Sequence, residues 1–153
     1  MRPRDLPLNK NGEKMRIFLL SAFFLLFAVS GAYAQKYCFN YAGARFGVNP
    51  NLLYAVAKVE SDFQPYAIDH DSNGSYDYGV MQINSVWYKE IGLKQWLNLK
   101  HVCFNIQVGA WIMSQCQERY NNTLQAIACY HSGGGSIRAN SNYISAVVAD
   151  LRK

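Results

Sequence analysis

The sequence predicts a mainly α-helical protein with a single domain. Three observations support this prediction: apolar residues recur at helical spacing after residue 35, turn residues separate these stretches, and the chain has 153 residues, a usual size for one domain. The stretch from Asp69 to Gly79 is too rich in turn-forming residues for a helix, so we expect a small hairpin or a turn-rich loop there.

Residues 1–34 have the pattern of a secretory signal peptide. A basic segment precedes an apolar run from Ile17 to Ser30, and Ala32-Tyr33-Ala34 supplies the small residues of a cleavage site. We therefore expect cleavage after Ala34 and one domain over residues 35–153. The run is short for a membrane span of about 20 residues, so an uncleaved anchor is the second interpretation. Met15 is an alternative start, because the segment before it is unusually long.

The positive charge of the chain lies largely in this leader. The whole sequence has 15 basic and 10 acidic residues, but ten and eight of them follow Ala34. A nearly balanced domain lacks the dense basic patch that nucleic-acid binding requires. We therefore expect no nucleic-acid partner.

Five helical stretches follow the predicted cleavage site. Asn49-Pro50 is a typical helix start, with asparagine as N-cap and proline as first helical residue, and Gln64-Pro65 stops the helix that it begins. The three glycines from Gly133 end another helix. The predicted helices cover residues 38–46, 52–62, 105–119, 123–130 and a last stretch that begins at Ser141 or Asn142.

The four cysteines all follow the predicted cleavage site. An even number of cysteines in an exported chain predicts two disulfides, whereas a zinc site is disfavoured because no pair has C-x2-C spacing. Cys116 and Cys129 flank a short turn between two helices, which would bring them together if the helices are antiparallel. We predict a Cys116–Cys129 disulfide and, by elimination, Cys38–Cys103.

Glu60 is the most prominent carboxyl group of the domain. It completes one face of its helix with the apolar residues seven, four and three positions earlier, Leu53, Val56 and Ala57. Burial on this face would raise its pKa and keep the carboxyl protonated near neutral pH, as a general acid requires. From the spacing alone, capping of a neighbour or a surface ion pair with Lys58 or Arg45 is the more common role for such a glutamate.

The loop from Asp69 to Asp77 resembles part of a calcium site. Its polar residues and Gly74 match the first nine positions of an EF-hand loop, but the glutamate of position twelve is replaced by Val80. We favour an Asx-rich turn between two short strands, with Asn73-Gly74 at the tip, and expect no metal ion. A calcium-dependent structural protein is the alternative.

Three motifs, in order, resemble the lytic transglycosylases of the soluble (SLT) type. Residues 60–65, ESDFQP, resemble their E-S-x-F/W-x-P, residues 79–83, GVMQI, resemble G-L-M-Q-I, and residues 126–133, AIACYHSG, resemble A-x-A-Y-N-A-G. Tyr143 resembles the tyrosine of their Y-V-x-x-V. The resemblance runs from about Cys38 to Leu151 and is strongest to small one-domain members of the IagB/VirB1 kind, which act with secretion, conjugation or pilus systems.

The resemblance implies a lysozyme-like fold, a periplasmic location and peptidoglycan glycan strands as substrate. The implied reaction cleaves the β-1,4 bond between N-acetylmuramic acid and N-acetylglucosamine without water and leaves a 1,6-anhydromuramic end. Glu60 would protonate the leaving oxygen and then accept the proton of the substrate's C6 hydroxyl. The resemblance implies no cofactor, and we expect a monomer that a protein component of an envelope machine brings to its site.

The resemblance also assigns roles to other residues. Tyr130 would hydrogen-bond and orient the catalytic carboxyl, and Ser61 would help to position it. Core packing is the alternative role and is most common for residues such as Met81 and Tyr143. The residues expected beside the glycan cleft or near the acid are Met81, Gln82, His131 and Tyr143.

His131 and Ser132 depart from the family motif, which has asparagine and alanine at these positions. A histidine could hydrogen-bond the sugar, add a pH dependence between about pH 5 and 8, or weaken the activity.

Two other functions are compatible with these residues. A muramidase that resembles goose-type lysozymes would use water, held by Asp62, Asp69 or Asp77, and leave a reducing end. A non-catalytic peptidoglycan-binding module would recruit an envelope machine to the wall, although the presence of Glu60 with Tyr130 argues against it. The machine served, the choice between internal and terminal cleavage, and any need for peptide stems are left open by the sequence.

Overall fold

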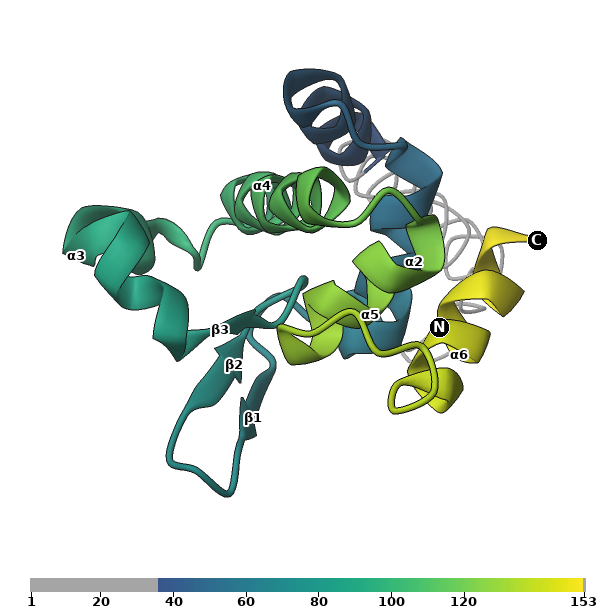
Figure 1. Cartoon of the computed structure of the whole chain (residues 1–153). Helices are drawn as coiled ribbons and strands as arrows, with labels where there is room; N and C mark the ends of the chain where they lie inside the picture. Colours follow the sequence, from purple (N-terminus) through teal and green to yellow (C-terminus); the bar gives the residue numbers. More distant parts are fainter. Residues whose placement is uncertain (1–35, 153) are drawn as a thin grey trace, which may run out of the picture. The chain divides into compact units, whose positions relative to one another are not determined.

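Helices dominate residues 36–152, the part of the chain that this computed structural model describes (Figure 1). The predicted signal peptide and its cleavage site lie outside the described residues. A helix over residues 36–46 comes first. The elements that follow are α2 (Pro50–Ser61), β1 (Ile68–His70), β2 (Tyr76–Tyr78), β3 (Ile83–Asn84), the 3-10 helix η1 (Ser85–Trp87), α3 (Tyr88–Asn98), α4 (Val102–Arg119), α5 (Thr123–Ser132) and α6 (Ser141–Leu151). The prediction of a mainly α-helical fold is confirmed.

The predicted start of α2 is also confirmed. The side chain of Asn49 caps the helix by accepting a 2.8 Å hydrogen bond from the backbone N–H of Asn51, and Pro50 is the first helical residue. The helix ends before Gln64-Pro65, because Asp62 and Phe63 both adopt left-handed backbone angles, with φ of 50° and 63°. These two residues turn the chain from α2 towards the strands.

Helix α3 has no counterpart among the predicted helices. Its sequence lacks the apolar stripe that marks a core helix, and none of its residues is fully buried. Gly92, with φ of 77°, interrupts the helical backbone inside it. The other differences are at helix ends: α4 begins three residues earlier than predicted and α5 continues two residues further.

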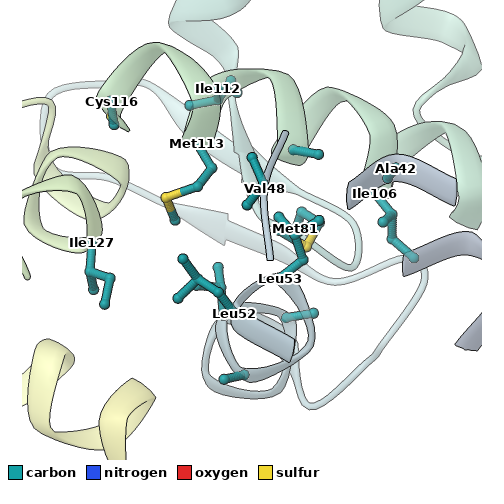
Figure 2. Close-up of a cluster of buried hydrophobic side chains, with 14 of the residues drawn as sticks. Ala42, Val48, Leu52, Leu53, Met81, Ile106, Ile112, Met113, Cys116 and Ile127 are labelled. Carbon is teal, nitrogen blue, oxygen red and sulfur yellow. The ribbon is translucent and has the colours of Figure 1, made fainter. Parts of the chain in front are cut away.

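The core lies between α2, α4 and α5 (Figure 2). Leu53 of α2, Ile106 and Met113 of α4, and Ile127 of α5 are fully buried there. Met81, in the loop that joins β2 to β3, is buried against the same helices. No helix within residues 36–152 is long and apolar enough to cross a membrane.

Both predicted disulfides are present. Cys38 bonds to Cys103, with a Cα–Cα distance of 5.1 Å, and ties the helix over residues 36–46 to the start of α4. Cys116 bonds to Cys129, with a Cα–Cα distance of 5.7 Å, and ties the end of α4 to α5. The second bond fixes the helix that carries the third sequence motif.

The turn-rich stretch forms the predicted hairpin. β1 and β2 pair in antiparallel register, with Asp69 opposite Asp77, and β3 pairs with the other edge of β2. The tip is a turn in which the backbone N–H of Gly74 donates to the carbonyl of Asp71 at 3.1 Å. Gly74 has φ of 86°, a left-handed conformation that favours glycine.

Candidate active site

A cleft of about 580 Å³ lies between the end of α2, the hairpin and the facing parts of α4 and α5. Glu60, Gln82, Tyr130 and His131 line it, and these four are predicted site residues. We call Glu60 of α2 with Tyr130 and His131 of α5 the helical side of the cleft. The hairpin side consists of the polar residues Asp69, Asp71, Asn73, Ser75 and Asp77.

Glu60 stands at the boundary between the core and the cleft. The apolar members of its helical face, Leu53, Val56 and Ala57, are fully buried, as the spacing predicts. Glu60 itself is partly buried, and its Oε1 atom accepts a 2.5 Å hydrogen bond from the hydroxyl of Tyr143 in α6. Within residues 36–152, Glu60 does not form the surface ion pair that spacing alone made the more common outcome, because its carboxyl faces the cleft and a partly buried donor.

The environment of Glu60 keeps about half of its carboxyls protonated at neutral pH. Burial raises the pKa to about 7; the hydrogen bond from Tyr143 opposes this rise, and the negative charge of Asp77 adds to it. The pKa of Tyr143 is also raised, by burial first and by the charge of Glu60 second. Tyr143 therefore keeps its proton and remains a hydrogen-bond donor at neutral pH.

The predicted hydrogen bond from Tyr130 to the acid is wrong. The Tyr130 hydroxyl donates instead to the backbone carbonyl of Met81 at 2.7 Å, and Tyr143 supplies the bond to Glu60. Tyr130 nevertheless lies near the acid. Burial makes the larger contribution to the raised pKa of Tyr130, and the charge of Glu60 makes the next. Its role in this structure is to hold the loop beside the acid.

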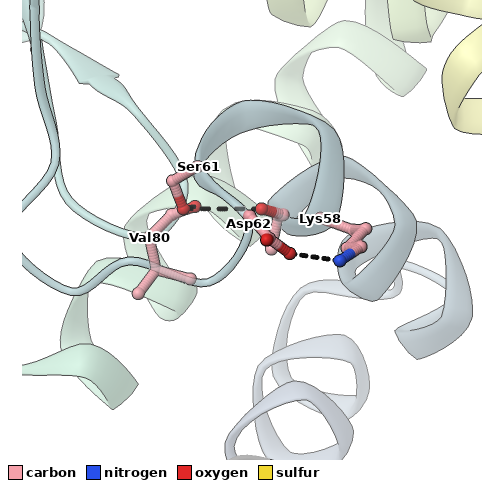
Figure 3. Close-up of polar contacts among 5 residues, drawn as sticks. Lys58, Ser61, Asp62 and Val80 are labelled. Atoms are coloured by element: carbon pink, nitrogen blue, oxygen red, sulfur yellow. Dashed lines mark hydrogen bonds and ion pairs between the residues drawn. The ribbon is translucent and has the colours of Figure 1, made fainter.

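Side chains from three helices fix that loop, residues 78–82. Ser61 of α2 donates to the carbonyl of Val80 at 2.8 Å, as Figure 3 shows, and Tyr130 of α5 holds the next carbonyl. Asn105 of α4 accepts from the N–H of Met81 at 2.8 Å and donates to the carbonyl of Tyr78 at 3.0 Å. Ser61 therefore ties this loop to α2, the helix that carries Glu60.

Asn105 is a positioning residue that sequence reasoning missed. It is fully buried, and a polar side chain among apolar neighbours on a helix was the available signal. Gly79 is required beside it, since a Cβ atom there would lie 2.3 Å from the Asn105 amide nitrogen. Gly79 also has φ of 80°.

Met81 and Gln82 take different places. Met81 is fully buried and does not line the cleft, so the prediction that places it there is wrong, and core packing is its role. Gln82 lines the cleft as predicted, with an unusual φ of 43°. Its side-chain amide donates to the carbonyl of Gly79 at 2.8 Å, which stabilises this conformation.

His131 and Tyr143 form a stacked pair beside the acid. Their ring centroids are 4.1 Å apart and the rings are inclined by only 8°. His131 is exposed and lines the cleft, whereas Tyr143 lies behind it, is partly buried and does not line the cleft. Both residues therefore belong to the surroundings of Glu60, Tyr143 by a direct bond and His131 through Tyr143.

The carboxylates proposed to hold water in a muramidase are not equivalent. Asp62 is exposed, forms an ion pair with Lys58 (Figure 3) and does not line the cleft. Asp69 and Asp77 do line it. The pKa of Asp77 is raised, chiefly by burial, while a hydrogen bond from Asn84 acts in the opposite direction.

The hairpin side has no arrangement typical of a metal site. Among residues 36–152, no group of three or more His, Cys, Asp or Glu side chains is placed to hold a metal ion. Asp71 accepts hydrogen bonds from the side chains of Ser75 at 2.5 Å and Asn84 at 2.9 Å, so it acts as an acceptor within the turn. These contacts are those of the predicted Asx-rich hairpin.

Comparison with known proteins gives a consistent picture. Residues 37–148 match the Transglycosylase SLT domain. The chain is 32% identical to invasion protein IagB of Salmonella typhimurium over 144 residues, which cover 91% of this chain and 88% of that protein. It is also 32% identical to protein IpgF of Shigella sonnei over 99 residues, which cover 63% of this chain and 65% of the Shigella protein.

The fold agrees with a solved structure. An inactive mutant of the lytic transglycosylase Slt from Pseudomonas aeruginosa superposes with a TM-score of 0.55 at 22% identity, over 74% of this chain and 20% of that one. The lysozyme-like fold expected from the motifs is thereby confirmed. Since the SLT domain spans most of the sequence and a relative at 32% identity matches nearly all of it, the chain belongs to the transglycosylase SLT family.

Proposed function

We propose that this protein is a peptidoglycan lytic transglycosylase whose catalytic residue is Glu60. One observation carries the proposal: the partly buried Glu60 carboxyl, with a pKa of about 7, faces a cleft and is held by the Tyr143 hydroxyl. Membership of the SLT family supports peptidoglycan as the substrate class.

The first step requires a protonated acid. The Glu60 carboxyl donates its proton to the glycosidic oxygen of N-acetylglucosamine while the bond from that oxygen to C1 of N-acetylmuramic acid breaks. At neutral pH about half of the Glu60 carboxyls carry this proton, because the pKa is near 7. The N-acetyl group of the muramic residue assists at C1.

The second step uses the same side chain as a base. The Glu60 carboxylate, stabilised by the Tyr143 hydrogen bond, accepts the proton of the C6 hydroxyl. The C6 oxygen then bonds to C1 and closes the 1,6-anhydro ring. The proton returns to Glu60, no water is consumed, and no second protein carboxylate is needed.

A muramidase remains the second candidate because of one observation. Asp77 lines the same cleft and its charge contributes to the raised pKa of Glu60, so a water held by Asp77 could attack C1 in place of the C6 oxygen. The two reactions differ in their products, since hydrolysis adds one water to the muramic end.

The test is a digest of purified sacculi by the oxidised protein, with the soluble products identified by mass spectrometry. We expect anhydromuramyl products, and none from Glu60→Gln. Products heavier by one water would identify a hydrolase, and equal product from wild type and Glu60→Gln would remove Glu60 from the mechanism. No product from either protein would favour a binding module.

We further propose that the enzyme acts in the periplasm, where it opens the wall locally for a secretion, conjugation or pilus apparatus. The signal-peptide pattern of residues 1–34 supports export, and the Salmonella relative is named an invasion protein. Fractionation of cells, with N-terminal sequencing of the protein, should recover it in the periplasm beginning at Gln35. Recovery in the cytoplasm with an intact leader would contradict this proposal.

A further inference from the structure

We infer that His131 is a positioning residue, whose ring holds Tyr143 so that the tyrosine hydroxyl stays on the Glu60 carboxyl. The inference deepens the proposed function, because it rests on Glu60 as the acid. It concerns the position at which this chain departs from the asparagine of the family motif.

The geometry is a relay across three helices. His131 is the penultimate residue of α5, Tyr143 lies in the first turn of α6, and Glu60 lies at the end of α2. The imidazole and phenol rings are nearly parallel at 4.1 Å, and the phenol hydroxyl is 2.5 Å from Oε1 of Glu60. Within residues 36–152, no ring other than the His131 imidazole packs against the Tyr143 ring.

The stack restrains the orientation of the Tyr143 side chain, on which its hydrogen bond to Glu60 depends. Rotation of the Tyr143 side chain would move its hydroxyl away from Glu60, and a ring lying flat against it opposes this rotation. Stacked aromatic pairs contribute a factor of about 2 to 12 in equilibrium beyond their buried area. Loss of the stack should therefore weaken the Tyr143–Glu60 bond by a factor in this range.

The charge of His131 is a separate property and must be distinguished from its ring. Asp77 of β2 interacts with His131 electrostatically, and Glu60 of α2 lies behind Tyr143 of α6. Asp69 and Asp71 of the hairpin and Arg119 of α4 line the same cleft. Replacement of His131 by an aromatic residue without ionisable atoms keeps the stack and removes any charge.

Two variants separate these effects. His131→Phe retains a flat ring against Tyr143, and His131→Asn introduces the family residue and removes the ring. Because His131 is exposed, both variants should fold, which their spectra will verify. Tyr143→Phe serves as the reference for complete loss of the hydrogen bond, with the stack intact.

The readout is the titration of the Glu60 carboxyl carbon by NMR in protein labelled at glutamate. Residues 36–152 contain three glutamates, and Glu60→Gln assigns the signal that belongs to Glu60. The titration needs no substrate, so it gives an answer even if the protein fails to cleave sacculi. The Tyr143 bond lowers the pKa of Glu60, so its weakening must move the titration to higher pH.

We expect His131→Asn to move the Glu60 titration to higher pH, towards that of Tyr143→Phe, and His131→Phe to leave it near the wild-type position. In a sacculus assay, His131→Asn should lower kcat about 2- to 10-fold and His131→Phe should restore it. An equal movement in both variants would assign the effect to imidazole charge, and no movement in His131→Asn would show that Tyr143 needs no support. Either result overturns the inference.

Discussion

The two sides of the cleft carry similar chemical groups in different surroundings. On the helical side, Glu60 lies on a helix face whose other residues are buried in the core, and the Tyr143 hydroxyl donates a hydrogen bond to its carboxyl. On the hairpin side, Asp69 and Asp71 belong to a hairpin whose first strand is exposed along its length. Carboxyl groups on both sides reach the cleft, but burial raises the pKa of Glu60 to about 7, which suits an acid at neutral pH, while the Tyr143 hydroxyl fixes the position of its carboxyl.

Asp77 is intermediate between these two cases. It is partly buried, and burial raises its pKa, but its side chain is hydrogen-bonded to Asn84 on the neighbouring strand. The difference from Glu60 therefore lies in the supporting contacts, and substitutions on the two sides should have unequal effects.

The largest difference should appear in activity. Glu60→Gln removes the transferable proton and should reduce cleavage of sacculi by about 10²- to 10⁴-fold or more, the contribution of a general acid. Asp77→Asn should retain most of the activity, because in the proposed reaction the substrate's C6 hydroxyl attacks C1 and no water has to be held. Rates of release of muropeptides measure both. A loss of activity in Asp77→Asn equal to that in Glu60→Gln would indicate a hydrolase with two essential carboxylates.

The helical side should also depend on the Cys116–Cys129 bond, which ties α4 to the helix that carries Tyr130 and His131. Replacing both cysteines by serine should lower the free energy of unfolding by about 2–4 kcal/mol, because a short closed loop is released in the unfolded chain. Urea denaturation of the oxidised proteins measures this. An unchanged midpoint would show that packing alone holds α5.

The buried acid should make stability depend on pH. The folded-state pKa of about 7 exceeds the ordinary value, so the folded protein binds more protons than the unfolded chain between about pH 4.3 and 7, and stability falls as pH rises through this window. Glu60→Gln removes the cost of ionising a buried carboxyl and should be more stable than wild type by roughly 3 kcal/mol above pH 7, with the advantage disappearing below about pH 4. Thermal unfolding at both pH values measures it, and an advantage that persisted at low pH would point to another cause.

The smallest effect should come from the hairpin tip. Gly74→Ala places a side chain at φ of 86°, which costs about 1 kcal/mol, although space around the site is open. The Glu60 titration should not change, because the strain stays on the hairpin side. Chemical denaturation and the NMR titration check the two parts. A shifted Glu60 titration would show that the two sides are coupled.

Local signals in the sequence predicted much of this fold. The Asn49-Pro50 helix start, the face that ends in Glu60 and the Cys116–Cys129 pair each depend on residues close in sequence or on a short turn, and the structure contains them all. Helix α3 was missed because its exposed residues show no apolar period and Gly92 interrupts it.

The choice between the two tyrosines could not be made from local signals. Tyr130 and Tyr143 lie on different helices, and which hydroxyl reaches Glu60 depends on how α5 and α6 pack against α2. Asn105 was missed for the same reason, since its two partners are 24 and 27 residues away in the chain. Contacts that depend on tertiary packing leave little trace in a single sequence.

The most direct test of the account is the titration of the Glu60 carboxyl in the wild-type protein by NMR. Burial of this carboxyl between Tyr143 and the core should give it a pKa of about 7. A value near 4.3, the ordinary value for glutamate, would mean that the carboxyl is ionised at neutral pH and is not the acid of this site.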